Sequence, residues 1–182
     1  MVRKCFFVSA FVFCLLSSGF ARAGEQEECK LPPAYIGSAE FEKMKSLAGA
    51  WEGESPMSPD GRMKMVYEVT SNGSAVVERC SPGTPYEMVS VYHDEKGKLA
   101  MTHYCAFGNQ PKLTLASSSA NKVKLVFAKG NAIKPKQETH MHSVEMTFAG
   151  PDHIRQEWVG YRNGKPQPPT IITLARMKET SR

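Results

Sequence analysis

The sequence predicts an all-β protein, an antiparallel up-and-down barrel of about ten strands preceded by one short helix. From Trp51 onward, apolar and polar residues alternate with period two in one short segment after another. Residues typical of tight turns, above all Gly, Asn and Pro, separate these segments at regular intervals. No internal repeat or linker divides the chain, so the segments belong to one domain, and each has an apolar and a polar face.

The first 23 residues are typical of a signal peptide and not of the folded domain. Two basic residues precede an apolar run over 5–16, and residues 21–23 form an Ala-Arg-Ala cleavage site. The apolar run is too short for an ordinary membrane span. We therefore expect cleavage near Ala23, a periplasmic or secreted product, and no stable membrane insertion.

Charge and cysteine content narrow the choice of partner and compartment. The full chain has a net charge of +5, but the leader holds three of its 23 basic residues and none of its 18 acidic ones. The mature chain, with 20 basic and 18 acidic residues, carries only +2, which argues against a nucleic-acid partner. It keeps Cys29, Cys80 and Cys105, so at most one intramolecular disulfide can form.

After the leader, residues 24–37 are expected to form an extended tail and residues 38–182 the barrel domain. The stretch SAEFEKMKSLAG predicts a single short helix, with Ser38 as its N-cap and Gly49 just past its end. Apolar residues recur along it at helical spacing. The alternation rule then predicts strands at 51–55, 63–70, 74–80, 86–93, 98–107, 111–118, 122–128, 138–148, 153–161 and 170–177.

The connections between these strands alternate in length, which predicts two different barrel ends. If the strands run up and down in order, one end has short turns and the other has longer loops rich in Pro and Gly. The short turns are 71–73, 94–97, 119–121 and 149–152, and the longer loops are 56–62, 81–85, 108–110, 129–137 and 162–169. A closed base and an open mouth are the layout of a ligand container.

The stretch GAWEGE, which begins at Gly49, resembles the Gly-x-Trp motif of calycin-type barrels, the lipocalins and fatty-acid-binding proteins. In that group the Trp lies on the first strand at the closed end, and an Arg from the last strand packs over it. The resemblance therefore implies that Arg176 covers Trp51. The alternation of connections independently puts both residues at the short-turn end.

Residues 41–177 also resemble an uncharacterised family of bacterial lipocalin-like proteins of unknown function. The marks of this resemblance are FEKMKSLAGAWEGE, GSAVVERC, EMVSVYH, THYCAFGNQP and HMHS. More distantly, the chain is similar to nitrobindin-like haem barrels, which hold haem through a single His. No residue-level motif transfers that haem site to this sequence.

Four side chains that can bind metals are predicted inside the mouth. Alternation places His103 and Cys105 on the apolar face of one strand, and His140 and His142 on the apolar face of another. Residues i and i+2 of a strand lie roughly 6.6 Å apart along the strand, so two such imidazoles can share one metal. With a His or Cys from across the lumen, the set suits zinc or copper.

Other interpretations of the same residues remain open. The four side chains can instead be polar groups in a pocket for a small apolar molecule, which we favour, or one His can ligate haem. A third alternative is a structural or interaction domain with a filled barrel. The predicted ligand-binding set is Met63, Met65, Tyr67, Glu78, Met101, His103, Cys105, His140, His142 and Trp158.

Two further interpretations concern Cys105. It can form a disulfide with Cys80, whose strand ends at the same mouth, if the two Cα atoms lie within about 7 Å. It can also pair with His103 as a nucleophile, but neighbours on one strand aim their side chains in parallel and no third group orients them. Because the sequence carries no complete catalytic signature, it favours a role other than catalysis.

Overall fold

The computed structural model describes residues 30–56, 58 and 60–178. The predicted signal peptide, Cys29 and the first part of the predicted tail lie outside the described residues, and residues 30–38 form neither helix nor strand. The elements of the domain are α1 (Ala39–Lys45), β1 (Gly49–Glu54), β2 (Arg62–Thr70), η1 (Ser71–Gly73), β3 (Ala75–Cys80), β4 (Met88–Glu95), β5 (Lys98–Tyr104), β6 (Lys112–Ser118), β7 (Lys122–Phe127), β8 (His140–Phe148), β9 (His153–Arg162), β10 (Lys165–Pro166) and β11 (Thr170–Arg176).

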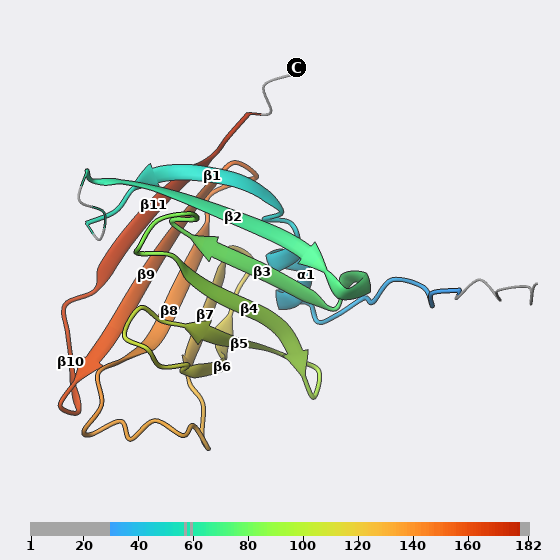
Figure 1. Cartoon of the computed structure of the whole chain (residues 1–182). Helices are drawn as coiled ribbons and strands as arrows, with labels where there is room; N and C mark the ends of the chain where they lie inside the picture. Colours follow the sequence, from blue (N-terminus) through green and yellow to red (C-terminus); the bar gives the residue numbers. More distant parts are fainter. Residues whose placement is uncertain (1–29, 57, 59, 179–182) are drawn as a thin grey trace, which may run out of the picture. The chain divides into compact units, whose positions relative to one another are not determined.

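The strands form one closed antiparallel barrel, which confirms the predicted fold class (Figure 1). Each strand from β1 to β9 pairs with the next along the chain, and β11 pairs with both β9 and β1. Ten strands therefore close the ring, and the two-residue β10 adds a small ribbon beside the end of β9. The architecture is an up-and-down antiparallel barrel of ten strands.

The two ends of the barrel differ as the connection lengths predict. The connections after β2, β4, β6 and β8 are short, and those after β1, β3, β5, β7 and β9 are longer. The helix α1 lies at the short-turn end, where Lys43 Nζ donates to the carbonyl of Ser119 and the Tyr35 N–H donates to the carbonyl of Asn72. The base is thus covered by α1, and the long-loop end is the mouth.

One aspartate fixes α1 over the base. The Asp94 carboxylate, at the end of β4, accepts hydrogen bonds from the Ser38 N–H at 2.6 Å and from the Ser38 hydroxyl at 2.8 Å. The same hydroxyl oxygen accepts the N–H of Phe41 at 3.2 Å, so Ser38 is the N-cap that the sequence predicts. Held this way, α1 buries Phe41 and Met44 completely in the barrel interior.

The predicted contact between the first and last strands is present at the base. Trp51 of β1 and Arg176 of β11 are paired in register, and the guanidinium lies 4.2 Å from the centroid of the indole. Arg176 also donates to the carbonyls of Ala48 at 2.7 Å and Ser46 at 2.9 Å. The indole N–H donates to the carbonyl of Leu47 at 2.8 Å, so the motif is anchored on both sides.

The backbone conformation and the nearby Arg176 side chain explain why the first residue of the Gly-x-Trp motif is glycine. Gly49 has φ +124°, a conformation that residues with a Cβ rarely adopt. A Cβ at this position would also lie only 3.1 Å from a terminal nitrogen of Arg176. Another residue here would therefore strain the backbone and displace the guanidinium at the entry to β1.

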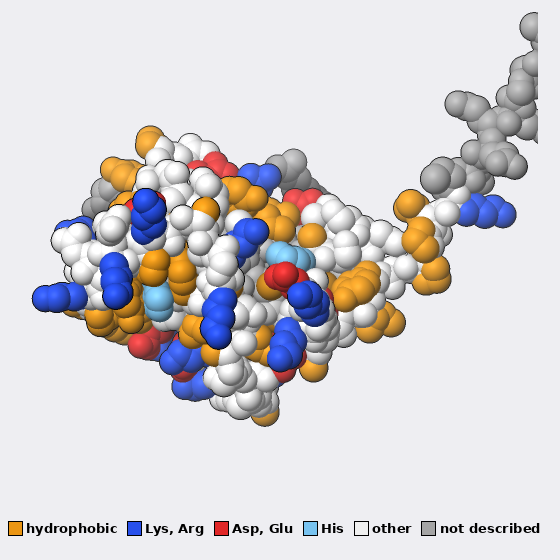
Figure 2. All heavy atoms as spheres, turned by 90° about the horizontal axis from the view of Figure 1, so that it is seen from below, with side chains coloured by type: hydrophobic (Ala, Val, Ile, Leu, Met, Phe, Trp, Pro, Cys, Tyr) orange, Lys and Arg blue, Asp and Glu red, His pale blue; other side chains and the backbone are white. Residues whose placement is uncertain are grey.

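On the face drawn in Figure 2, Lys and Arg side chains are more prominent than acidic ones. Lys and Arg side chains are spread over that face, with hydrophobic and acidic side chains between them. Among the described residues, no helix has both the length and the apolar character needed to cross a bilayer.

Replacing Arg176 by Ala should destabilise the barrel by about 2–3 kcal/mol, because it removes the cation–π contact and leaves two base carbonyls without their donor. Urea unfolding followed by tryptophan fluorescence measures this change. Arg62→Ala is the matched control, since Arg62 is exposed and its side chain forms a surface ion pair with Glu52. The control should change the free energy of unfolding by less than about 0.5 kcal/mol. Equal effects of the two substitutions would contradict the role assigned to Arg176.

Candidate functional site

A cavity of about 380 Å³ lies inside the barrel at the long-loop end. Its lining includes residues from four of the long connections, those after β3, β5, β7 and β9. The strand walls are mainly apolar, and the deeper part carries polar side chains. The apolar lining includes Met63, Met65, Met88, Met141, Trp158 and Ile172, and the polar lining includes Glu78, Cys80, His103, Cys105, Thr139 and Gln156.

The structure brings together part of the predicted ligand-binding set. The predicted residues that line the cavity are Met63, Met65, Glu78, His103, Cys105 and Trp158. Tyr67 and Met101 are fully buried in the core but are not lining residues. His140 and His142 do not line the cavity either.

A β-bulge explains why the two histidines of β8 are elsewhere. In the β8–β9 ladder, Met141 pairs with Gly160 and Ser143 with Val159, so His142 is an extra residue on β8. The extra residue shifts the alternation at the start of the strand. As a result, Thr139 and Met141 line the cavity where simple alternation places His140 and His142.

His140 and His142 instead form a stacked aromatic cluster with Phe127 and Tyr161. The His142 ring stacks on Tyr161 at 3.8 Å between centroids and on Phe127 at 5.2 Å. His140 Nδ1 contacts the carbonyl of Glu138 at 2.8 Å and must donate to it, because a carbonyl only accepts. Nε2 of His140 then accepts from Nδ1 of His142 at 3.1 Å, so both ring nitrogens of His140 have partners.

The four predicted metal ligands are not assembled into one site. Within the part of the chain that the structure describes, no three His, Cys, Asp or Glu side chains are placed to hold a metal ion. The thiols also lack thiolate character. Burial, with the Glu78 charge nearby, raises the pKa of Cys80 to about 12, and burial raises the pKa of Cys105.

The disulfide between Cys80 and Cys105 is not formed, and both are free thiols. Cys80 ends β3 and Cys105 follows β5, with β4 paired between these two strands. Strands two places apart in a sheet are separated by roughly 9–10 Å, which is more than a disulfide spans. The Cys80 thiol contacts Met63 Sδ at 3.7 Å instead.

A hydrogen-bonded network of polar side chains lies behind the deep part of the cavity, and Glu78 is at its centre. Of this network, Glu78, His103 and Gln156 line the cavity. Glu78 is 1% exposed. Its carboxylate accepts from the Ser90 hydroxyl at 3.0 Å, the Tyr92 hydroxyl at 3.0 Å and the Gln156 amide at 3.1 Å. In the described residues no Lys, Arg or His forms an ion pair with it. Hydrogen bonds alone therefore hold this buried carboxyl group.

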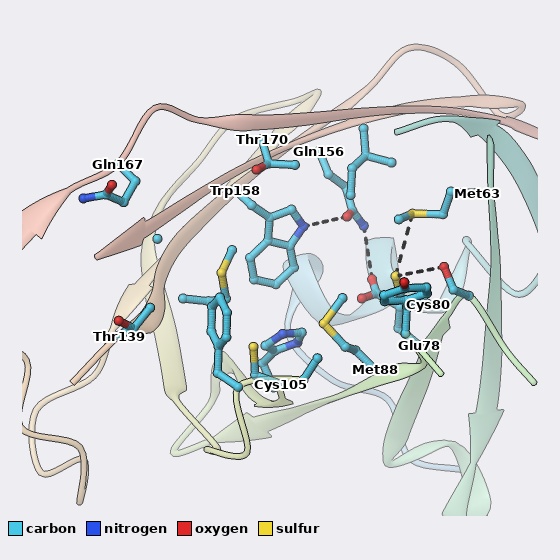
Figure 3. Close-up of a pocket in the computed structure, with 18 of the residues that line it drawn as sticks. Met63, Glu78, Cys80, Met88, Cys105, Thr139, Gln156, Trp158, Gln167 and Thr170 are labelled. Carbon is cyan, nitrogen blue, oxygen red and sulfur yellow. Dashed lines mark hydrogen bonds between the residues drawn. The ribbon is translucent and has the colours of Figure 1, made fainter. Parts of the chain in front are cut away.

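Gln156 connects the network across the lumen. Its side-chain carbonyl accepts from Trp158 Nε1 at 2.8 Å. Its amide nitrogen donates to Glu78 and, at 2.7 Å, to the hydroxyl of Tyr67. Figure 3 shows Gln156 between Trp158 and Glu78, with both contacts drawn. Side chains of β9 and β3, from opposite walls, are therefore joined in the interior.

His103 joins the same network from β5. Its Nδ1 lies 3.0 Å from the Ser90 hydroxyl, and its ring centroid lies 5.0 Å from that of Trp158. Nε2 has no hydrogen-bond partner among the described residues, and His103 lines the cavity. His103 is thus held at one ring nitrogen and open to a ligand at the other.

Burial shifts the pKa values of these groups in opposite directions. It raises the pKa of Glu78, while hydrogen bonds from its neighbours lower it and offset part of that rise. It raises the pKa of the Tyr67 and Tyr92 hydroxyls, with the Glu78 charge adding to the rise. Burial also lowers the pKa of His103 to about 4, so the imidazole is neutral at pH 7.

Sequence reasoning missed Ser90, Tyr92 and Gln156, although the alternation contains the signal for them. Ser90 and Tyr92 share a face of β4 with buried Met88, and Gln156 shares a face of β9 with buried Ile154 and Trp158. A polar residue between two buried apolar ones on the same strand face must find a partner inside the barrel.

Comparison with known proteins identifies no family for this chain. No protein-family profile matches the sequence, and no curated protein matches it. One solved structure that it resembles is the crystal structure of Rv2717c from M. tuberculosis. The two chains share 11% sequence identity, the match covers 79% of this chain and 100% of that chain, and the TM-score is 0.48.

Wild-type protein should lose about 2–3 kcal/mol of stability through His103 as the pH falls from 7.5 to 4.5. The pKa of His103 is about 4 when folded and near 6.5 when unfolded, so in this window only the unfolded chain takes up the proton. The contribution is complete above pH 6.5 and is lost as the pH approaches 4. Urea unfolding at the two pH values measures it.

His103→Gln should remove this part of the acid sensitivity, whereas His153→Gln, at an exposed histidine, should keep it. An equal acid loss in wild type and His103→Gln would contradict the assignment.

Proposed function

We propose that this chain is a binding protein that holds a small, largely apolar molecule in the cavity at the mouth of its barrel. The observation that carries this proposal is the cavity of about 380 Å³ with apolar walls and a hydrogen-bonded polar interior. Its volume lies within the range of small-molecule sites, roughly 300–1,000 Å³.

The chemistry of the lining supports an apolar ligand with few polar groups. Met63, Met88, Met141 and Ile172 offer flexible or branched apolar surface, and Trp158 offers a flat one. Most polar atoms of the interior already have hydrogen-bond partners within the network, so few of them need a polar group of the ligand as a partner. The ligand's affinity then comes mainly from apolar area removed from water.

We further propose that the protein is exported and belongs to the bacterial lipocalin-like family that its sequence marks resemble. The leader-like residues 1–23 support export. Expression of the full chain in a bacterium and mass measurement of the product test this proposal. A mature chain that begins at Gly24 is expected, and an uncleaved chain retained with the cytosolic fraction would contradict export.

A second candidate function is ligation of haem or a single metal ion by His103. The observation that favours it is the unpartnered Nε2 in the cavity, with Nδ1 fixed by Ser90 in the manner of a metal-binding imidazole. The residues fit one imidazole ligand, and they do not fit the zinc or copper set of several ligands. A Soret band after incubation with haemin, lost in His103→Gln and kept in His153→Gln, is the expected result of this alternative.

The cavity should bind the neutral fluorescent probe N-phenyl-1-naphthylamine in a saturable 1:1 complex. Thr170→Trp should weaken this binding at least tenfold, because Thr170 lines the cavity beside Trp158 and a larger side chain fills it (Figure 3). Fluorescence titration measures the affinity.

Ile171→Trp is the matched control, since Ile171 is the next residue of β11 and faces solvent. It should bind the probe as wild type does. Equal weakening by the two substitutions, or no saturable binding in wild type, would overturn the proposed binding site.

A further inference from the structure

The hydrogen bonds of Gln156 have a fixed direction, and Trp158 sets it. An indole N–H can only donate, so the Gln156 atom 2.8 Å from Trp158 Nε1 must be the amide oxygen. The other end of that amide is therefore NH₂, and its two protons go to Glu78 and Tyr67. No other orientation of Gln156 satisfies both sides.

Glu78 receives only donors in this arrangement. The amide of Gln156 and the hydroxyl of Tyr92 reach one carboxylate oxygen, and the hydroxyl of Ser90 reaches the other. An ionised carboxylate accepts at both oxygens and needs no acceptor of its own. The three contacts therefore suit the charged form of Glu78, and the directions of the Ser90 and Tyr92 hydroxyls follow from that charge.

Ser90 passes this direction on to His103. A hydroxyl has a single proton, and when Ser90 gives it to Glu78 only its lone pairs remain for the contact with His103. Nδ1 of His103 must then carry the ring proton and donate it to Ser90. In a neutral imidazole this leaves Nε2 as a bare acceptor in the cavity.

We propose that Glu78, acting through Ser90, fixes which ring nitrogen of His103 carries the proton, and that the cavity consequently selects apolar molecules bearing one hydrogen-bond donor, such as phenols. The ligand class rests on the proposed function, whereas the effect on His103 does not. Glu78 and Ser90 are positioning residues, and His103 Nε2 is the atom that meets the ligand.

Reversing the hydrogen bond between residue 78 and Ser90 shows why Glu78 determines the His103 tautomer. If the group at position 78 donates to Ser90, the hydroxyl turns and donates to Nδ1, and the ring proton moves to Nε2. The cavity then presents a donor in place of an acceptor. The other titratable groups near this relay, Tyr67, Tyr92, Cys80 and Cys105, carry raised pKa values and stay neutral at pH 7.

The surroundings of His103 favour a flat ligand with a hydroxyl or N–H group. The Trp158 ring lies beside the imidazole, with 5.0 Å between centroids, and both rings line the cavity. An aromatic molecule can therefore contact the indole while its donor reaches Nε2. A molecule with only acceptors would leave Nε2 without a partner.

The first experiment measures the tautomer of His103 directly by ¹⁵N NMR of histidine-labelled protein at pH 7. Wild type should show protonated Nδ1 and unprotonated Nε2 at His103. In Glu78→Gln, Gln156 and its fixed N–H should hold the new carbonyl oxygen, so the new amide N–H faces Ser90 and the His103 proton moves to Nε2. Ser90→Ala should give a mixture of His103 tautomers, both alone and in combination with Glu78→Gln.

His140 is an internal control, because the Glu138 carbonyl holds its Nδ1 proton in every variant. A wild-type His103 protonated at Nε2, or an unchanged tautomer in Glu78→Gln, would overturn the relay. If Glu78→Gln does not fold, Ser90→Ala alone decides, since an unmixed Nδ1–H tautomer without the hydroxyl would equally overturn it.

The second experiment tests the ligand class with phenol and its methyl ether, anisole. Phenol carries a hydroxyl that can donate a hydrogen bond, and anisole has no donor. Wild type should bind phenol about fivefold more tightly than anisole, the ratio expected for one hydrogen bond. Glu78→Gln should lose or invert this preference. Equal binding of both probes by wild type would overturn the ligand class, and absence of binding by both would overturn the proposed function while the tautomer measurement stands.

Discussion

The pairing of β1 with β11 is the constraint on which the rest of the structure depends. It joins the last strand of the barrel to the first, and only this closure gives the inward side chains of all strands a common interior. Arg176 and Trp51 lie on these two strands, so the cation–π contact and the carbonyl contacts at the base secure the closure itself. Because the ring is closed, Glu78 on β3 meets Gln156 on β9 across 78 residues of chain.

A buried carboxylate without a cationic partner is costly, and the barrel offsets this cost with donors from several walls. Ser90 and Tyr92 reach Glu78 from β4, and Gln156 reaches it from β9. These contacts have strict lengths and directions, whereas methionine side chains adapt to many shapes. The interior therefore combines a rigid polar cluster with a deformable apolar wall, and the cavity lies between them.

Period-two alternation and connection length were enough to predict the ten strands of the ring and the two different barrel ends, and helical spacing with the Ser38 cap was enough to predict the helix. These features depend on local chemistry, namely which face of a strand is apolar and where turn residues occur. The placement of His140 and His142 depended on one extra residue in β8, and no local signal separates a bulge from regular alternation there. The roles of Ser90 and Gln156 depend on partners on other strands, so only the closed barrel reveals them.

Comparison of two buried histidines of this protein shows that a histidine can bind a ligand only where one of its ring nitrogens has no partner within the protein. In both His103 and His140, Nδ1 is held by an oxygen, from Ser90 in one and from the Glu138 carbonyl in the other. At His140 the second nitrogen, Nε2, accepts from His142, so neither ring nitrogen of His140 remains to bind a ligand. At His103 the second nitrogen faces the cavity without a partner, and a neutral ring at pH 7 makes it an acceptor. The number of histidines in the sequence pointed to a metal site. The assignment of a proton to each hydrogen bond of the network points instead to a cavity that binds a ligand with a hydrogen-bond donor.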